Sequence, residues 1–244
     1  MVDSTDSGLH GRESEWFVPK YGPLRFRTFI GLLFLPYTGM VLSFSIIGSL
    51  LAENIFYERL FAIVIIYFFG LGIAAHALDA LGSNGTKPWG SVFTKYQLWS
   101  VAIISLVFAY GIAIYYMILY VPLLWIVAGL EGFFVFAYNL EWFGGRFHTD
   151  RWFAVSWGAL PVLAGHVMQT NSISFPALIL AVSMGFFSSV EIKASRPYKE
   201  LKRRWPDLND EEKAILQRYE AILKYISLGV ILLGAGLLLC RAAG

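Results

Sequence analysis

Residues 96–139 read YQLWSVAIISLVFAYGIAIYYMILYVPLLWIVAGLEGFFVFAYN, and Glu131 is the one acidic or basic side chain in this stretch. A helix that crosses a bilayer needs about 20 predominantly apolar residues. The stretch is therefore long enough for two crossings, joined near Tyr116–Tyr120. Because so few residues join them, we expect these two helices to form a tight antiparallel pair.

The whole chain has the same character. Of its 244 residues 57% are hydrophobic and 15% are charged, whereas soluble domains have about 45–50% apolar and about 25% charged residues. This composition excludes a soluble enzyme domain, a disordered chain and a fibrous repeat. The net charge of +2 is too small to indicate binding to nucleic acid, and the single Cys240 cannot form an internal disulfide.

Other long apolar runs extend this pattern and predict an all-α, polytopic bundle of about seven transmembrane helices. The expected spans lie near residues 27–52, 57–79, 96–116, 118–139, 151–169, 173–191 and 219–240. Continuous runs of this kind exclude a transmembrane β-barrel, whose strands alternate apolar and polar residues. With the N-terminus in the cytoplasm, 17 of the 19 Lys and Arg residues fall on the inner side, and only Arg59 and Arg241 fall outside. The positive-inside rule therefore predicts a cytoplasmic N-terminus.

We expect one membrane domain over residues 25–241. It follows a polar N-terminal segment, residues 1–24, which contains Trp16–Tyr21 and is expected to lie at the membrane interface. A cytoplasmic loop or helix is expected at about 192–218. There, Asn209 or Asp210 is suited to cap a helix that continues into the last span.

Polar side chains gather at the cytoplasmic ends of spans two, four and six. His76 and Asp79 are three residues apart and share a helix face, and the loop that follows them consists of small residues. The other members are Asn84 and Lys87 in that loop, Tyr138 and Asn139 at the end of span four, and Glu191, Lys193 and Arg196 at the end of span six. Their common depth predicts a polar chamber for an amphiphile with a charged head and an apolar tail. The alternative is that Asp79 is a solvated loop acid and the basic residues are interface anchors.

Two ionisable groups, Glu131 and His166, lie away from the cytoplasmic ends of the spans. Glu131 is seven residues before Tyr138, hence about 10 Å deeper in the membrane, and we expect it to be protonated or paired, for instance with a tyrosine hydroxyl. His166 lies near the far end of span five and is expected to be a packed or interfacial histidine.

Residues 75–83, AHALDALGS, are similar to the first acidic motif, N-D-x-x-D-x-x-x-D, of the UbiA superfamily of intramembrane prenyltransferases. Asp79 matches the central aspartate, and His76 stands in place of the upstream acid. Tyr138 resembles the family's tyrosine after span four, and residues 153–161, FAVSWGALP, look like its fifth span. Glu191 is the one acid at the second motif. Ala75 and Ser83 depart from the first motif, and the chain has fewer spans than the usual nine.

The resemblance implies transfer of a prenyl group from a diphosphate donor to a lipid-soluble acceptor at a cytoplasm-facing intramembrane site. Asp79 and Glu191 would bind Mg²⁺ and, with His76 and Tyr138, form the catalytic set. The substrate-binding set would be Asn84, Lys87, Asn139, Lys193 and Arg196. The alternative is a non-catalytic relative that binds a lipid, quinone or pigment, or a subunit of a larger membrane complex. A transporter is a third alternative, which Glu131 suggests.

Overall fold

The computed structural model describes residues 15–82 and 92–243, and within these ranges the chain is helical and has no strand. The elements, in chain order, are α1 (Leu24–Leu32), α2 (Leu35–Ser49), α3 (Tyr57–Tyr67), η3 (Phe68–Ala75), α4 (His76–Gly82), α5 (Lys95–Leu119), α6 (Leu124–Asn139), α7 (Asp150–Ala154), η5 (Val155–Ala159), α8 (Leu160–Thr170), α9 (Phe175–Arg203), η6 (Trp205–Asp207) and α10 (Asp210–Ala243). The prediction of an α-helical protein of membrane type is confirmed.

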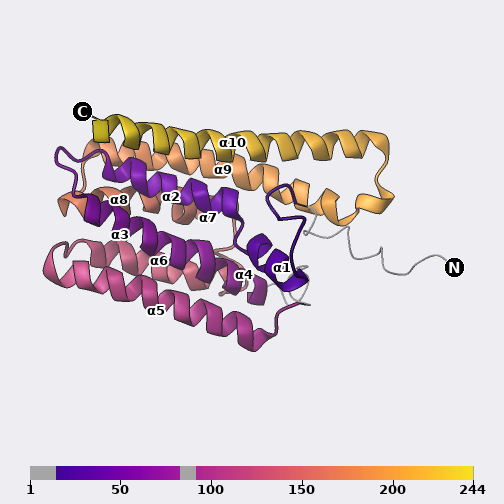
Figure 1. Ribbon diagram of the computed structural model, residues 1–244, viewed down its shortest axis with the longest axis horizontal. Helices are drawn as coiled ribbons and strands as arrows, with labels where there is room; N and C mark the ends of the chain where they lie inside the picture. The colour runs from indigo at the N-terminus through magenta and orange to yellow at the C-terminus, as the bar shows by residue number, and fades with distance from the viewer. Residues whose placement is uncertain (1–14, 83–91, 244) are drawn as a thin grey trace.

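Five helices in the described residues are long and apolar enough to cross a membrane: Leu24–Ser49, Tyr57–Gly82, Lys95–Leu119, Phe175–Arg203 and Asp210–Ala243. The expected fourth span is the shorter helix α6, and the expected fifth span is the continuous segment formed by α7, η5 and α8. The helices run side by side along the long axis of the molecule (Figure 1). The turns before α3, α6 and α9 lie at one end, whereas α1, α4 and the α9–α10 turn lie at the other end (Figure 1).

Helix α5 packs mainly against α3, η3 and α4, and its contact with α6 is slight. The expected tight pair of spans three and four is therefore replaced by a looser arrangement. The Tyr110 hydroxyl, which donates a hydrogen bond of 2.9 Å to the Ala128 carbonyl, bridges the two helices. A bulky tyrosine at this contact keeps the α5 and α6 backbones apart.

The second and fifth spans each contain a π-helical segment, η3 and η5. In η5 the reason lies in the sequence, because Pro161 has no N–H to donate to the carbonyl of Trp157 and its ring would clash with that carbonyl in a regular α-helix. The wider π turn just before α8 removes this conflict. Short π-helical stretches within α-helices are frequent at functional sites. His76 follows directly after η3, and Trp157 lies within η5.

Glycines allow α2 and α8 to touch backbone to backbone. A Cβ on Gly48 would lie 2.0 Å from the Val162 carbonyl oxygen, and a Cβ on Gly165 would lie 2.0 Å from the Ser45 carbonyl oxygen. Small residues permit this close approach of helices in membranes. The contact holds α2 and α8 together within the bundle.

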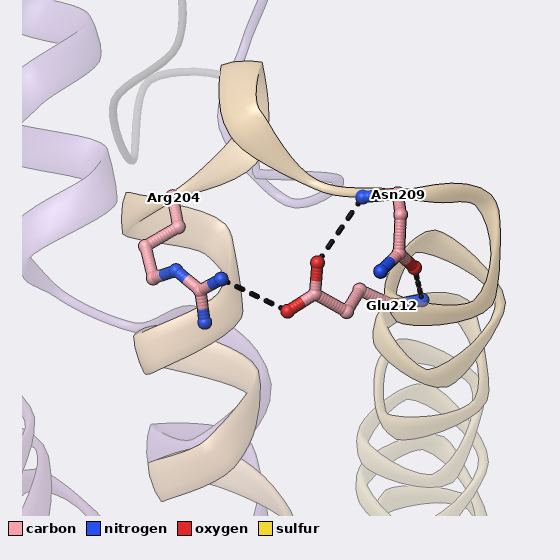
Figure 2. A network of polar contacts seen from close by, with 3 residues as sticks. All are labelled: Arg204, Asn209 and Glu212. Atoms are coloured by element: carbon pink, nitrogen blue, oxygen red, sulfur yellow. Dashed lines mark hydrogen bonds and ion pairs between the residues drawn. The ribbon is translucent and has the colours of Figure 1, made fainter.

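In the region expected to be a loop or helix, residues 192–218, helix α9 continues to Arg203, and a short connection around η6 leads into α10. The predicted cap of α10 is confirmed: the Asn209 side chain accepts a hydrogen bond of 2.9 Å from the Glu212 backbone, and the Glu212 carboxylate accepts one of 3.1 Å from the Asn209 backbone. This reciprocal capping box satisfies two free N–H groups at the helix start. Arg204 at the end of α9 donates to the same carboxylate at 2.9 Å, which ties the two helices together (Figure 2).

The segment before α1 folds over the same end of the bundle. Glu15 is buried and accepts a hydrogen bond of 2.6 Å from the Tyr198 hydroxyl on α9. The Phe17 ring packs against Phe34 and Tyr37, with centroid distances of 5.8 and 6.4 Å. These contacts are with protein, so this part of the N-terminal segment covers the bundle.

Candidate functional site

A cavity of about 170 Å³ lies at the end of the bundle that holds α1 and α4. By the usual allowance this volume has room for about ten water molecules. It is lined by Phe34, Tyr37, His76, Asp79, Tyr138, Asn139, His148, Phe153, Trp157, Glu191, Ile192, Ser195, Arg196 and Lys199. Polar groups and aromatic rings thus meet in one compartment.

Six of the nine residues predicted for the site line this cavity. They are His76, Asp79, Tyr138, Asn139, Glu191 and Arg196. Lys193 is exposed and does not line it. Asn84 and Lys87 lie outside the described residues. The structure thus brings the ends of spans two, four and six together, as their common depth predicts.

The spacing of residues on α9 explains which of its side chains face the cavity. Glu191, Ser195 and Lys199 are four residues apart, so they form one stripe along the helix. Lys193 is two residues from Glu191 and hence points to nearly the opposite side. Glu191 is 4% exposed. Helix α9 therefore places the buried Glu191 carboxyl and the Lys199 ammonium group on the same side of the cavity, about two helical turns apart.

Two cationic groups stand at the more accessible part of the cavity. The Arg196 guanidinium forms an ion pair of 3.1 Å with Asp150 at the start of α7. It also donates to the His148 carbonyl at 3.4 Å. The Lys199 ammonium lies 5.2 Å from the centre of the Phe34 ring. The Arg196 side chain is 45% exposed, so an anionic group that enters the cavity can reach it.

Aromatic rings form the inner part of the site around His76. The His76 ring lies between Phe34 and Trp157, at centroid distances of 5.0 and 5.1 Å. Phe153 stacks on Trp157 at 5.4 Å. Phe34 has a positive φ of 44° at the break between α1 and α2, a conformation that costs a bulky residue about 1–3 kcal/mol and often occurs at functional sites.

Eight lining residues were not among the predicted set: Phe34, Tyr37, His148, Phe153, Trp157, Ile192, Ser195 and Lys199. His148 stacks on Tyr138 at 4.5 Å, and its Nδ1 lies 3.0 Å from the Tyr138 carbonyl oxygen. The spacing of Lys199 from Glu191 was a signal available in the sequence. The position of His148 was not, because it depends on how the chain turns between α6 and α7.

The cavity contains two carboxyls that are candidate metal ligands. Asp79 and Glu191 both line the cavity, but no group of three His, Cys, Asp or Glu side chains in residues 15–82 and 92–243 is arranged to hold a metal ion. Mg²⁺ prefers six oxygen ligands and often takes several from phosphates and water. Two carboxyls are too few for a two-ion centre, and a single ion here would need most of its ligands from a bound phosphate and water.

The two deeper groups lie elsewhere. Glu131 lines a second cavity, and its Oε1 accepts a hydrogen bond of 2.8 Å from the Tyr67 hydroxyl, which confirms the expected pairing with a tyrosine. His166 is buried in α8, and neither of its ring nitrogens has a partner among the described residues. It is thus a packed histidine, as expected.

The chain was also compared with models of protein families, with curated proteins and with solved structures. None of the three comparisons finds a match.

Proposed function

We propose that this protein binds a prenyl diphosphate in the cavity between α4, α6 and α9 and transfers the prenyl group to a lipid-soluble acceptor. The observation that carries the proposal is the gathering of His76, Asp79, Tyr138, Glu191 and Arg196 around one cavity. The resemblance of residues 75–83 to the first acidic motif of the UbiA superfamily supports it.

The orientation in the membrane is part of the proposal. Seven segments cross the bilayer, α6 and the α7–η5–α8 segment included, and the N-terminus and the cavity face the cytoplasm. The excess of Lys and Arg at this end of the bundle supports this orientation. A diphosphate from the cytoplasm would then enter at the polar end, while the prenyl chain would reach the aromatic and apolar interior.

Each group of cavity residues would have a role that follows from its chemistry. Arg196 and Lys199 would hold the phosphate oxygens, whose negative charge grows as the bond from prenyl carbon to diphosphate oxygen breaks. Asp79 and Glu191 would hold one Mg²⁺ bound to the diphosphate, and the ion would neutralise further charge on the leaving group. His76, Phe34 and Trp157 would enclose the first prenyl carbons, and the exclusion of water there favours transfer over hydrolysis.

The experiment is a turnover assay with purified protein in lipid nanodiscs. Geranylgeranyl diphosphate and a bilayer extract as acceptor source are supplied, and diphosphate release is measured. Glu191→Gln should reduce the rate at least about 100-fold, a size typical for the loss of one charge-stabilising group. Glu211→Gln, an exposed acid on α10, is the matched control and should leave the rate unchanged. Equal rates for the two variants would contradict the proposal.

A second candidate function is non-catalytic binding of a lipid, quinone or pigment within a larger membrane complex. The lack of three metal-ligating side chains in one place among the described residues favours it. Native purification with stoichiometric partners, together with prenyl diphosphate binding but no turnover, would support this function over transfer.

A further inference from the structure

A second cavity, of about 60 Å³, lies between α3–η3, α5 and α6 in the middle of the bundle. Apart from Tyr67, Tyr110 and Glu131, its lining consists of aliphatic residues, alanines and glycines. Several lining residues, among them Ile66, Gly70 and Ala128, are partly exposed. The cavity therefore reaches the outer surface of the bundle at a level where the flanking helices are apolar.

One carboxyl oxygen in this cavity lacks a partner. Glu131 Oε1 accepts the hydrogen bond from Tyr67, but Oε2 is buried and has no hydrogen-bond partner among the described residues. The Tyr110 hydroxyl does not supply one, because it donates to the Ala128 carbonyl. A buried polar atom without a partner costs free energy, so this oxygen marks a place for a hydrogen-bonding group of a ligand.

The packing around the carboxyl keeps the space open. A Cβ on Gly132 would lie 2.1 Å from the Tyr110 hydroxyl oxygen, so glycine is required there for Tyr110 to span the gap between α5 and α6. A Cβ on Gly70 would meet only the Ala109 Cβ, at 3.9 Å. Small residues thus border the cavity, and the slight contact between α5 and α6 leaves a path to the surface.

We infer that this cavity binds an apolar molecule from the bilayer through a single hydroxyl group, which forms a hydrogen bond with Glu131 Oε2. The volume suits a hydroxyl and the first carbons of a chain, since it equals room for about four water molecules. A cationic head fits less well, because a charge pair would be buried among apolar walls with no further hydrogen bonds to offset its desolvation. The inference does not depend on prenyl transfer, because this cavity and the Asp79–Glu191 cavity share no lining residue.

The test uses octanol that carries a photoreactive diazirine, with the full chain in detergent micelles and crosslinks mapped by mass spectrometry. Labels are expected on the cavity-lining residues of α5 and α6. Octanol should compete with the label about tenfold better than octane at equal mole fraction in the micelle, which corresponds to about one buried hydrogen bond. Equal competition by octane and octanol would overturn the inference.

Three variants sharpen the result. Gly70→Leu fills the cavity and should reduce labelling at least about fivefold, whereas Gly111→Leu on the open side of α5, where a Cβ meets no atom within 4 Å, should leave labelling unchanged. The double variant Tyr67→Phe/Glu131→Leu removes both partners of the buried hydrogen bond, so it is expected to fold. It should still be labelled, but octanol and octane should now compete equally. Labelling that is insensitive to Gly70→Leu, or a hydroxyl preference that survives the double variant, would refute the site.

Discussion

The ring centroids of His76 and Trp157 lie 5.1 Å apart, and each residue takes its position from a π-helical segment. A π turn adds one residue to the helical repeat, so it rotates every residue that follows relative to a regular α-helix. In the second span this rotation precedes His76 and Asp79. In the fifth span it surrounds Trp157. The two irregular turns thus direct these side chains into one cavity.

His76→Ala should lower the free energy of unfolding by about 2 kcal/mol, because it removes a buried ring that packs between Phe34 and Trp157. Unfolding in a denaturing detergent gives this value. Tyr96→Ala is the control, since Tyr96 is 81% exposed and its loss should change stability by less than about 0.5 kcal/mol. Equal stabilities of the two variants would show that the His76 contacts do not hold the site together.

Removal of Mg²⁺ should weaken the binding of geranylgeranyl diphosphate at least about tenfold, because the two phosphates would then face Asp79 and Glu191 without an intervening cation. Titration of the purified protein in EDTA and in excess Mg²⁺ measures the difference. Asp79→Asn should abolish most of the Mg²⁺ effect, since it removes one of the two carboxyls. Binding that is equal with and without Mg²⁺ would exclude a metal role for these acids.

The sequence predicted the helical fold class, and it predicted that six of the nine candidate residues lie near one another, because both depend on where the apolar runs begin and end. Apolar run length places the helices, and the ends of those runs place Asp79, Tyr138 and Glu191 at one level. Apolar run length does not determine how each helix is rotated about its own axis, and this rotation decides which side chains face the cavity. Lys193 and Lys199 both follow the expected sixth span on α9, but they lie on different sides of the helix: Lys199 lines the cavity with Glu191, whereas Lys193 is exposed.

The residues that sequence reasoning missed sit where the chain leaves regular helix. Phe34 enters the cavity because the first span breaks there with a positive φ. His148 is positioned by a turn in which Glu141, Phe143 and two glycines also have positive φ values. Such conformations are selected by surrounding contacts, and neither a bulky aromatic nor a glutamate indicates them in advance.

Gly165→Ala should destabilise the bundle by about 3 kcal/mol, because the added Cβ would overlap the Ser45 carbonyl and force α2 and α8 apart. Gly229→Ala provides the matched control, since a Cβ there has no atom within 4 Å and alanine favours the helix. Unfolding curves of both variants in detergent give the comparison. A Gly165→Ala protein as stable as the control would show that α2 and α8 are not in backbone contact.

The proposed orientation predicts which side of the membrane each end of the bundle faces. In a Cys240→Ser background, Asn54→Cys should react with a membrane-impermeant maleimide added to intact cells. Lys213→Cys should react only after the membrane is permeabilised. The α2–α3 turn, which contains Asn54, and the start of α10, which contains Lys213, lie at opposite ends of the bundle (Figure 1). The reverse pattern would therefore invert the topology, and labelling of both positions from outside would contradict the proposed arrangement of spans.

The most direct measurement of the central claim is the affinity for geranylgeranyl diphosphate of two charge-matched variants on α9. Arg196→Gln should weaken binding about tenfold, because it removes a cation at the cavity, and it should change stability little, since the exposed ion pair with Asp150 is worth about 0–1 kcal/mol. Lys193→Gln, on the other side of the helix, should bind as the unmodified protein does. Equal losses in both variants, or none in either, would contradict the binding of an anionic headgroup in this cavity.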